Sequence, residues 1–182
     1  AVEKATSLFW TKGYVETSVE DIVRATGLNR YALYNSFGGK REMLLEALAR
    51  FHGQRMKSVQ GLFEDPSMLP WQAMRHMFVA LIEEVLSSGN GCLMCNTVSE
   101  IAPKDEEVAR VCNVYSAEFV ELIGAKLRDA QAAGALRSDL VPEEVARLLL
   151  IFKIGLATLA KAGAPRGILL NAVDSQVAAL SS

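Results

Sequence analysis

The stretch that decides the fold is GYVETSVEDIVRATGLNRYALYNSFGGK, residues 13–40. Thr17 and Ser18 offer hydroxyl groups that can cap a helix, and Glu20 and Asp21 follow at the spacing of a capping box. A short helix is therefore predicted to begin just after Ser18.

A second short helix is predicted directly after the first. Gly27 permits a tight turn between the two, and Asn29 can cap a helix that runs through Ser36. Leu28, Leu33 and Phe37 would fill a small core. Two short helices joined by a tight turn are typical of a helix-turn-helix, whose second helix fits a DNA major groove.

The flanking residues complete a small helical head. Residues 1–12 place Ala5, Leu8 and Phe9 on one helical face. After the glycine pair at 38–39, residues 40–61 read as one long helix. We therefore expect an N-terminal helix-turn-helix domain over residues 1–50.

This head resembles the DNA-binding domain of the tetracycline-repressor (TetR) family. The resemblance covers about the first 50 residues, and the remainder is similar to the family in length and helix count only. The matching positions are Leu8, Phe9, Gly13, Tyr14, Thr17, Ser18, Ile22, Gly27, Leu33, Tyr34, Phe37 and Lys40. Tyr31 departs from the family, which often has a small residue there. The basic arm that many members carry before the first helix is not in this sequence, so one groove contact is expected to be missing.

Roles at the DNA follow from side-chain chemistry together with this resemblance. We expect Arg30, Tyr31 and Asn35 to lie at the base edges, where Arg reads guanine, Asn reads adenine and Tyr packs on a thymine methyl group. The cap Asn29 is also expected to contribute to DNA binding. Phosphate contacts are expected from Thr17, Ser18, Tyr34 and Lys40. Core packing for Tyr34 and simple helix capping for Thr17 and Ser18 are the alternatives.

The rest of the chain also reads as helices, so the fold is predicted to be all-α with about nine helices. Pro66 and Pro70 bracket a loop before a helical ligand-binding and dimerisation domain, residues 51–182. The predicted helices span residues 71–87, 92–102, 105–133, 142–162 and 165–180.

The last two helices predict a homodimer. Residues 142–162 are apolar nearly all round, and residues 165–180 carry one apolar stripe. A helix without a polar face needs neighbours on every side. Two such helices from each of two chains would form a four-helix bundle.

Charge and composition limit the location and the partners. Residues 1–57 hold nine Lys/Arg against six Asp/Glu, whereas residues 58–182 hold ten against fifteen. A basic head on an acidic body favours a polyanion partner at one end. No membrane span or signal peptide is visible, and three cysteines form no secreted disulfide framework, so a cytoplasmic protein is expected.

The resemblance implies a pocket for an apolar or aromatic small-molecule inducer inside the second domain. Met and aromatic side chains make adaptable apolar walls. Glu118 is expected on or near the buried face, and Glu100 ends the predicted helix over residues 92–102. Such a carboxylate could meet a cationic or hydrogen-bonding ligand group, pair with an arginine such as Arg75, or sit at the edge in water. The lining candidates are Trp71, Met74, Phe78, Met94, Val98, Tyr115, Glu118, Phe119 and Phe152.

Cys92 and Cys95 form a C-x-x-C motif at a predicted helix start. A helix N-terminus lowers a thiol pKa, so a sensor of oxidants or electrophiles is one interpretation, and inert buried cysteines are the other. A metal site with Cys112 is not favoured, because His52 and His76 fall at no ligand spacing. No metal or cofactor is expected.

Among function classes, the helix-turn-helix and the family resemblance together imply a homodimeric regulator of a palindromic operator, and the resemblance implies ligand response and repression. Enzyme activity is not expected, because no Ser/His/Asp set, zinc-protease motif or phosphate-binding glycine loop occurs. A helical interaction module without DNA binding is the alternative class, and the sequence does not separate repressor from activator.

Overall fold

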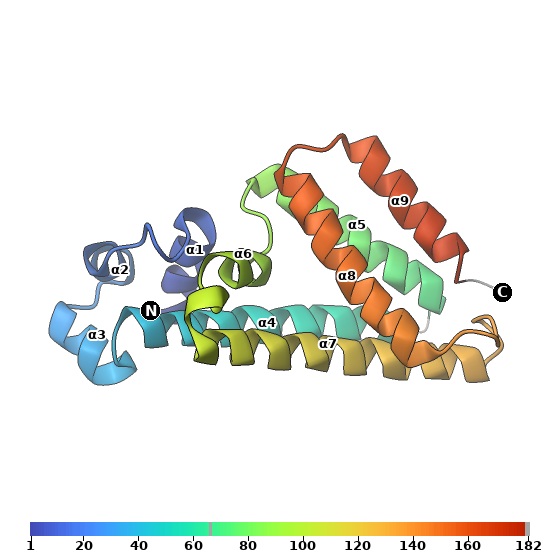
Figure 1. Ribbon diagram of the computed structural model, residues 1–182, viewed down its shortest axis with the longest axis horizontal. Coiled ribbons are helices and arrows are strands. Elements are labelled where there is room, and N and C mark those ends of the chain that lie inside the picture. Colours follow the sequence, from blue (N-terminus) through green and yellow to red (C-terminus); the bar gives the residue numbers. More distant parts are fainter. Residues whose placement is uncertain (66, 181–182) are drawn as a thin grey trace. The chain divides into compact units, whose positions relative to one another are not determined.

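The computed structural model describes residues 1–65 and 67–180, which form nine α-helices and no β-strand (Figure 1). The all-α prediction with about nine helices is confirmed. Pro66 lies outside the described residues. The elements are α1 (Val2–Lys12), α2 (Val19–Thr26), α3 (Arg30–Phe37), α4 (Lys40–Glu64), α5 (Pro70–Ser88), α6 (Leu93–Glu100), the short 3₁₀ turn η1 (Ala102–Lys104), α7 (Glu106–Ala132), α8 (Pro142–Lys161) and α9 (Arg166–Ala178).

The chain divides into two compact units. The head unit contains Ala1–Arg55 and Cys92–Val114, and the body unit contains Met56–Gly91 and Tyr115–Ser182. The helix-turn-helix and the segment from α6 to the start of α7 therefore share one unit. Sequence patterns had assigned residues 92–114 to the second domain, and the division at residue 50 stays a functional prediction.

Local signals set the helix boundaries of the head. Ser18 and Asp21 form the predicted capping box, with Asp21 N–H 3.0 Å from Ser18 Oγ and Ser18 N–H 2.9 Å from Asp21 Oδ2. Gly27 ends α2 with a φ of 78°, which favours glycine. Asn29 then caps α3, accepting from Ala32 N–H at 2.7 Å. These contacts confirm the predicted cap positions.

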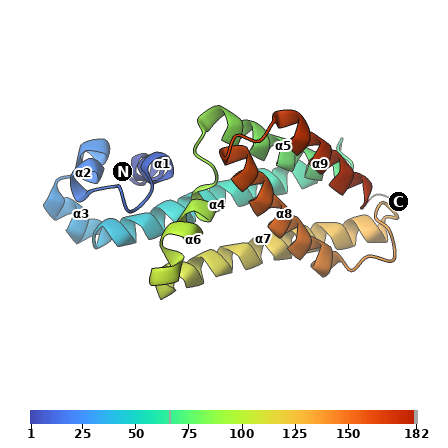
Figure 2. The ribbon, with the colours of Figure 1, turned by 45° about the horizontal axis from the view of Figure 1, so that its top comes forward.

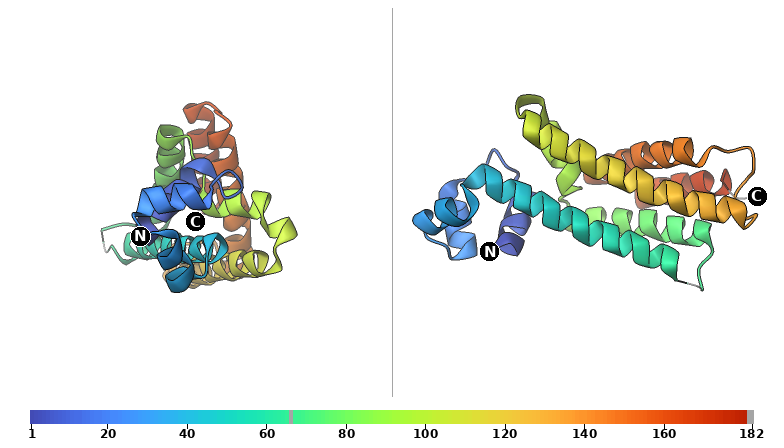
Figure 3. Two further views of the ribbon diagram at one scale, coloured as in Figure 1. Left: turned by 90° about the vertical axis from the view of Figure 1, so that its left-hand side faces the viewer. Right: turned by 90° about the horizontal axis from the view of Figure 1, so that it is seen from below.

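In the head unit, α1, α2 and α3 lie beside the first half of α4 (Figure 3), and the side chains that these helices bury form an apolar core. Phe9, Ile22 and Leu33 are almost fully buried, together with Met43 and Leu44 of α4. Each short helix is therefore fixed by one or two large side chains, as expected when packing rather than helix length stabilises a helix.

The segment α6–η1–α7 adds its own buried side chains to the head unit. Leu93, Thr97 and Val108 are buried, and α6 contacts α1. The sequence predicted a helix as far as Ala102, but α6 ends at Glu100 and Pro103 lies inside η1. Proline disfavours α-helical geometry at the residue before it, which explains the earlier end.

The body unit is built around α5, which packs against both α8 and α9 (Figure 2). Phe78, Ile82 and Val85 of α5 lie in its apolar core with Leu149 and Val173. Ion pairs join the helices at the surface, with Arg75 Nε 2.7 Å from Asp174 Oδ1 and Arg166 Nε 2.7 Å from Glu83 Oε1.

Two of the body helices keep large apolar side chains exposed. Leu148, Ile151, Ile154 and Leu159 of α8 are exposed, as is Ile168 of α9. Within the described ranges, no single helix combines the length and hydropathy of a membrane span; α5 and Leu93–Lys104 reach them only when counted together as a bent pair.

Candidate functional site

The outer face of α3 presents polar and aromatic side chains to solvent. Leu33 fixes the helix from its buried side, while Tyr31 and Tyr34 are 78% and 52% exposed. Arg30 and Asn35 are exposed as well. The predicted base-edge residues therefore lie on the accessible surface of one short helix, the arrangement that a major-groove reader needs.

Arg30 has a partner on the neighbouring helix. Its guanidinium forms an ion pair with Glu20 of α2, and both side chains are more than half exposed. Exposed ion pairs contribute little to stability, so this arginine can exchange its partner for a base at small cost. Glu20 was seen in the sequence only as a helix-capping residue.

The predicted phosphate contacts differ in how accessible they are. Ser18 stands at the N-terminus of α2, where backbone amides favour an anion, and Tyr34 is exposed rather than packed in the core. Thr17 is only 1% exposed, and its hydroxyl donates to the carbonyl of Gly13. The expectation that the Thr17 hydroxyl contacts phosphate is therefore not supported; it ties the turn between α1 and α2 together.

Lys40 is the first residue of α4 and lies against the turn between α1 and α2. Its Nζ is 4.1 Å from the centroid of the Tyr14 ring and 3.5 Å from the carbonyl oxygen of Val15. Partial burial lowers the pKa of Lys40, and the nearby carboxylates of Glu100 and Asp21 oppose that shift. The ammonium group is thus held in a defined place by a ring and a carbonyl.

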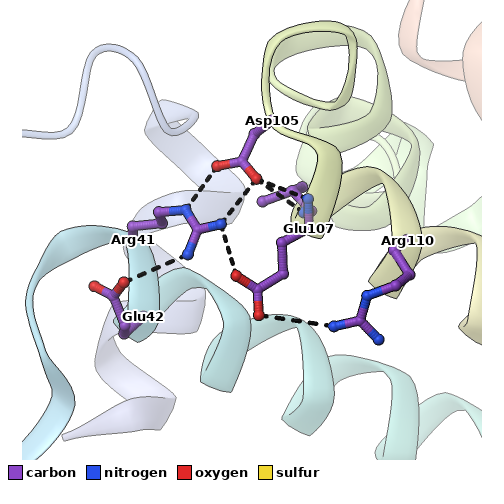
Figure 4. A network of polar contacts seen from close by, with 6 residues as sticks. Arg41, Glu42, Asp105, Glu107 and Arg110 are labelled. Carbon is purple, nitrogen blue, oxygen red and sulfur yellow. Dashed lines mark hydrogen bonds and ion pairs between the residues drawn. The ribbon is translucent and has the colours of Figure 1, made fainter.

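Arg41 links the beginning of α4 to the beginning of α7 (Figure 4). Its Nε lies 2.7 Å from Asp105 Oδ2, and its Nη2 lies 2.9 Å from Asp105 Oδ1 and 2.8 Å from Glu107 Oε2. Hydrogen bonds to Arg41 lower the pKa of Asp105 to about 2, and the two carboxylates raise the pKa of Arg41. Sequence reasoning missed this network.

Glu100 has a role that the sequence did not indicate. Its carboxylate accepts hydrogen bonds from Tyr14 N–H at 3.0 Å and from Val15 N–H at 2.7 Å. Pairing with Arg75, one of the alternatives for this carboxylate, does not occur, because Arg75 bonds Asp174. Glu100 is therefore a contact of the helix-turn-helix head.

The candidate inducer-binding residues do not form one group. Met74, Phe78 and Phe119 are buried in the body core, with Trp71 and Phe152 partly buried beside them. Tyr115 is half-buried. Glu118 is exposed on α7, which contradicts a place on the buried face and agrees with the alternative that it sits at the edge in water. Met94 and Val98 belong to the head unit, and Val98 is 43% exposed.

Aromatic contacts fill the part of the body core that contains Trp71, Met74, Phe78, Phe119 and Phe152. Phe78 and Phe152 meet edge to face with centroids 5.2 Å apart, and Lys153 Nζ lies 4.3 Å from the centre of the Phe119 ring. An open groove of about 530 Å³ occurs elsewhere, between α7 and α8. It is lined by Ser116, Ala117, Val120, Glu121, Gly124, Arg128, Glu143, Arg147 and Leu150, none of which was a predicted ligand contact.

The three cysteines are thiols in the head unit. Cys92 and Cys112 are buried and Cys95 is half-buried, and none forms a disulfide. Burial, with a smaller contribution from Cys92, raises the pKa of Cys112 to about 11. This shift disfavours the reactive thiolate at Cys112, while a sensing role for Cys92 and Cys95 stays a prediction. No group of residues suited to hold a metal occurs in the described part of the chain.

Comparison with known proteins agrees with this geometry. Residues 1–47 match the family model for bacterial regulatory proteins of the tetR family. The HTH-type transcriptional repressor DhaR of Mycobacterium sp. (strain GP1) is 28% identical over 149 residues, covering 82% of this chain and 74% of that protein. The HTH-type transcriptional repressor ComR of Escherichia coli (strain K12) is 27% identical over 167 residues, which cover 90% of this chain and 79% of that protein.

Solved structures share the fold over nearly the whole chain. A cysteine mutant of the TetR family transcriptional regulator CifR, complexed with 26-base-pair double-strand operator DNA, has a TM-score of 0.85 at 25% identity and covers 98% of this chain and 94% of that one. Regulatory protein TetR from Rhodobacter sphaeroides has a TM-score of 0.87 at 20% identity, covering 98% and 96%. With its signature residues, exposed recognition helix and matching body, the chain belongs to the TetR family of bacterial DNA-binding transcriptional regulators.

Proposed function

We propose that the chain is a homodimeric, ligand-responsive repressor that inserts α3 into the major groove of a palindromic operator. The observation that supports the proposal most strongly is the exposed face of α3. Arg30, Tyr31 and Asn35 lie on this face, and the buried Leu33 fixes the helix from its opposite side. A helix that is held by a buried leucine and presents polar and aromatic side chains to solvent is suited to reading base edges.

Each of these side chains has a distinct task at the base pairs. Arg30 would leave Glu20 and donate two hydrogen bonds to the O6 and N7 of a guanine, and Asn35 would pair with the N6 and N7 of an adenine. Tyr31 would pack against a thymine methyl group. Asn29 stays at the edge of this surface, since its side-chain oxygen already caps α3.

Two helix N-termini and one aromatic hydroxyl supply the phosphate contacts. The cap of α2 at Ser18 and the first residue of α4, Lys40, each add to the partial positive charge of a helix N-terminus. Tyr34, which is half exposed on α3, would donate a hydrogen bond from its hydroxyl group to a backbone phosphate of the DNA. Such contacts fix the register of α3 without reading sequence.

The apolar face of α8 and α9 is the proposed dimer interface. Leu148, Ile151, Ile154 and Leu159 of α8, with Ile168 of α9, leave a row of exposed branched side chains. Burying them against the same row on a second chain would give an interface with twofold symmetry. Two heads would then read two half-sites of a palindrome.

Repression and release are assigned by analogy with the relatives, which are named as repressors. The inducer is proposed to be an apolar or aromatic small molecule that enters the body between Met74, Phe78, Phe119 and Phe152. It would favour a conformer that no longer matches the operator, and it can shift the balance only through its different affinities for the two forms. The chain would thus act through binding rather than catalysis.

DNA binding by variants of the full chain tests this proposal. On a duplex enriched from a randomised pool, Arg30→Ala and Asn35→Ala should each lower affinity by about 1–3 kcal/mol and relax preference at one base pair. Arg137→Ala, which removes a surface arginine paired locally with Asp139, is the matched control and should bind like wild type. Equal, small effects of all three substitutions would contradict base reading by α3.

A further inference from the structure

Lys40 is held by two residues of the turn between α1 and α2. The Tyr14 ring lies beneath its ammonium group at 4.1 Å, and the carbonyl oxygen of Val15 is 3.5 Å from Nζ. The position of the cation therefore depends on the position of this turn. All of these residues belong to the head unit.

The same two residues are bound from their backbone side by Glu100. Its two carboxylate oxygens each accept one amide hydrogen, from Tyr14 at 3.0 Å and from Val15 at 2.7 Å. Charge-assisted hydrogen bonds of this kind are stronger than neutral ones. One carboxylate, 85 residues away in sequence, thus fixes two consecutive peptide groups.

Gly13, the residue before Tyr14 and Val15, also lies close to the Glu100 carboxylate. Gly13 has a φ of 81°, and a Cβ atom placed on it would lie 3.2 Å from both oxygens of Glu100. The turn therefore approaches Glu100 more closely than most side-chain-bearing residues would allow. The backbone conformation at Gly13 is therefore matched to the contact with Glu100.

A second contact holds the next residue of α4. Arg41 is bound by Asp105 and Glu107, which follow Glu100 within the same short segment. Lys40 therefore lies between a turn fixed by Glu100 and an arginine fixed by Asp105. Both fixed points come from outside the helix-turn-helix.

We infer that Glu100 is a positioning residue for DNA binding, which holds the Tyr14–Val15 turn so that Lys40 meets a backbone phosphate. The inference rests on the proposed phosphate contact of Lys40. Without the carboxylate, the turn loses its support and Lys40 loses the ring and carbonyl that hold its ammonium group. Binding then costs the ordering of a long, flexible side chain.

Whether DNA affinity rises or falls when Glu100 is neutralised separates a positioning role from a purely electrostatic one. Glu100 carries a negative charge close to Lys40, so a carboxylate acting only through its charge would repel DNA. Neutralising it by Glu100→Gln would then raise DNA affinity. A positioning role predicts the opposite, since Gln keeps only one oxygen acceptor for two amides.

The test measures dissociation constants of the full chain on the enriched duplex at several salt concentrations. Glu100→Gln should weaken binding about three- to tenfold, and Glu106→Gln should not weaken it, because Glu106 is an exposed carboxylate of the same segment. Glu100→Asp keeps the charge but shortens the reach, so it should also weaken binding. Circular dichroism checks that each variant is folded. If the Glu100→Gln variant is not folded, the DNA affinity of the Glu100→Asp variant is used instead.

Coupling to Lys40 completes the experiment. Lys40→Met should weaken binding and reduce the salt slope by about one, and Glu100→Gln should add little in that background. Tighter binding by Glu100→Gln, or an undiminished effect in the Lys40→Met background, would overturn the inference. If Lys40→Met itself leaves affinity and salt slope unchanged, the proposed phosphate contact fails instead.

Discussion

The guanidinium of Arg41 and the carboxylate of Asp105 form a two-point contact, with Nε 2.7 Å from Oδ2 and Nη2 2.9 Å from Oδ1. The two residues are 64 positions apart, and each lies at the N-terminal end of a long helix. This contact and the Glu100 contact make the segment from the end of α6 to the start of α7 a structural part of the head that carries the helix-turn-helix. The head is therefore larger than the helix-turn-helix that the sequence motif defines.

Acid should weaken the head through Asp105. Its pKa is about 2 in the folded chain, below the value of about 4 for an unfolded Asp. A carboxyl with a lowered pKa stabilises the fold above its unfolded pKa, and this contribution disappears as pH falls from about 4 to about 2. Asp105→Asn should therefore lower the free energy of unfolding at pH 6 and reduce its loss between pH 4 and pH 2, as measured by urea titration.

An exposed carboxylate provides the control for that titration. Asp129→Asn removes one exposed acid of α7 in the body unit and should leave the pH dependence close to wild type. Parallel pH curves for wild type and the Asp105 variant would mean that the contact with Arg41 contributes nothing in solution.

Two glycines should respond oppositely to alanine. Gly13 has a φ of 81° and faces the Glu100 carboxylate, so Gly13→Ala should destabilise the chain by about 1–2 kcal/mol and weaken DNA binding. Gly53 lies within α4, and a Cβ atom placed on it would meet no neighbouring atom within 4 Å, so Gly53→Ala should stabilise the chain by about 0.5–1 kcal/mol. Denaturant unfolding of the pair checks both signs, and a destabilised Gly53 variant with an unaffected Gly13 variant would contradict the description of these sites.

The two roles assigned to Ser18 can be separated by measuring stability and binding together. Ser18→Ala removes the cap of α2 and should cost about 1 kcal/mol of stability. Ser7→Ala is the control, because Ser7 is an exposed residue within α1 whose hydroxyl bonds Glu3 of its own helix. If Ser18 also contacts phosphate, its variant should lose DNA affinity under conditions where both variants are fully folded. Unchanged affinity would restrict Ser18 to capping.

Local features of this fold were predictable from sequence because their causes are local. The Ser18–Asp21 capping box, the turn at Gly27 and the cap at Asn29 each depend on residues within three positions of one another. The same holds for the outward face of α3, which follows from helix geometry once Leu33 is placed in the core.

The contacts that complete the head could not be predicted in this way. Glu100 and Tyr14 are 86 residues apart, and nothing in either local pattern indicates that a carboxylate will meet two backbone amides. Thr17 looked like a surface hydroxyl because its polarity was visible and its burial was not. Glu118 was placed near the core from its neighbours Tyr115 and Phe119, although one residue along a helix turns the side chain well away from Phe119.

The cysteines should differ in their reactivity toward iodoacetamide. Cys112 has a pKa of about 11 and is buried, so its thiolate is scarce near neutral pH. Cys95 is half-buried in the first turn of α6 and should be alkylated first. Mass spectrometry of the folded chain over time tests the order, with the urea-unfolded chain as reference. Fast alkylation of folded Cys112 would contradict the environment that raises its pKa.

Selection of DNA from a randomised duplex pool, followed by sequencing, shows whether α3 reads a DNA sequence. We expect enrichment of one near-palindrome whose half-sites lie about one helical turn apart, and Arg30→Ala and Asn35→Ala should each lose the preference at individual base pairs. No enrichment at low salt by the folded chain would contradict a sequence-reading role for α3 and favour a helical interaction module that does not bind DNA.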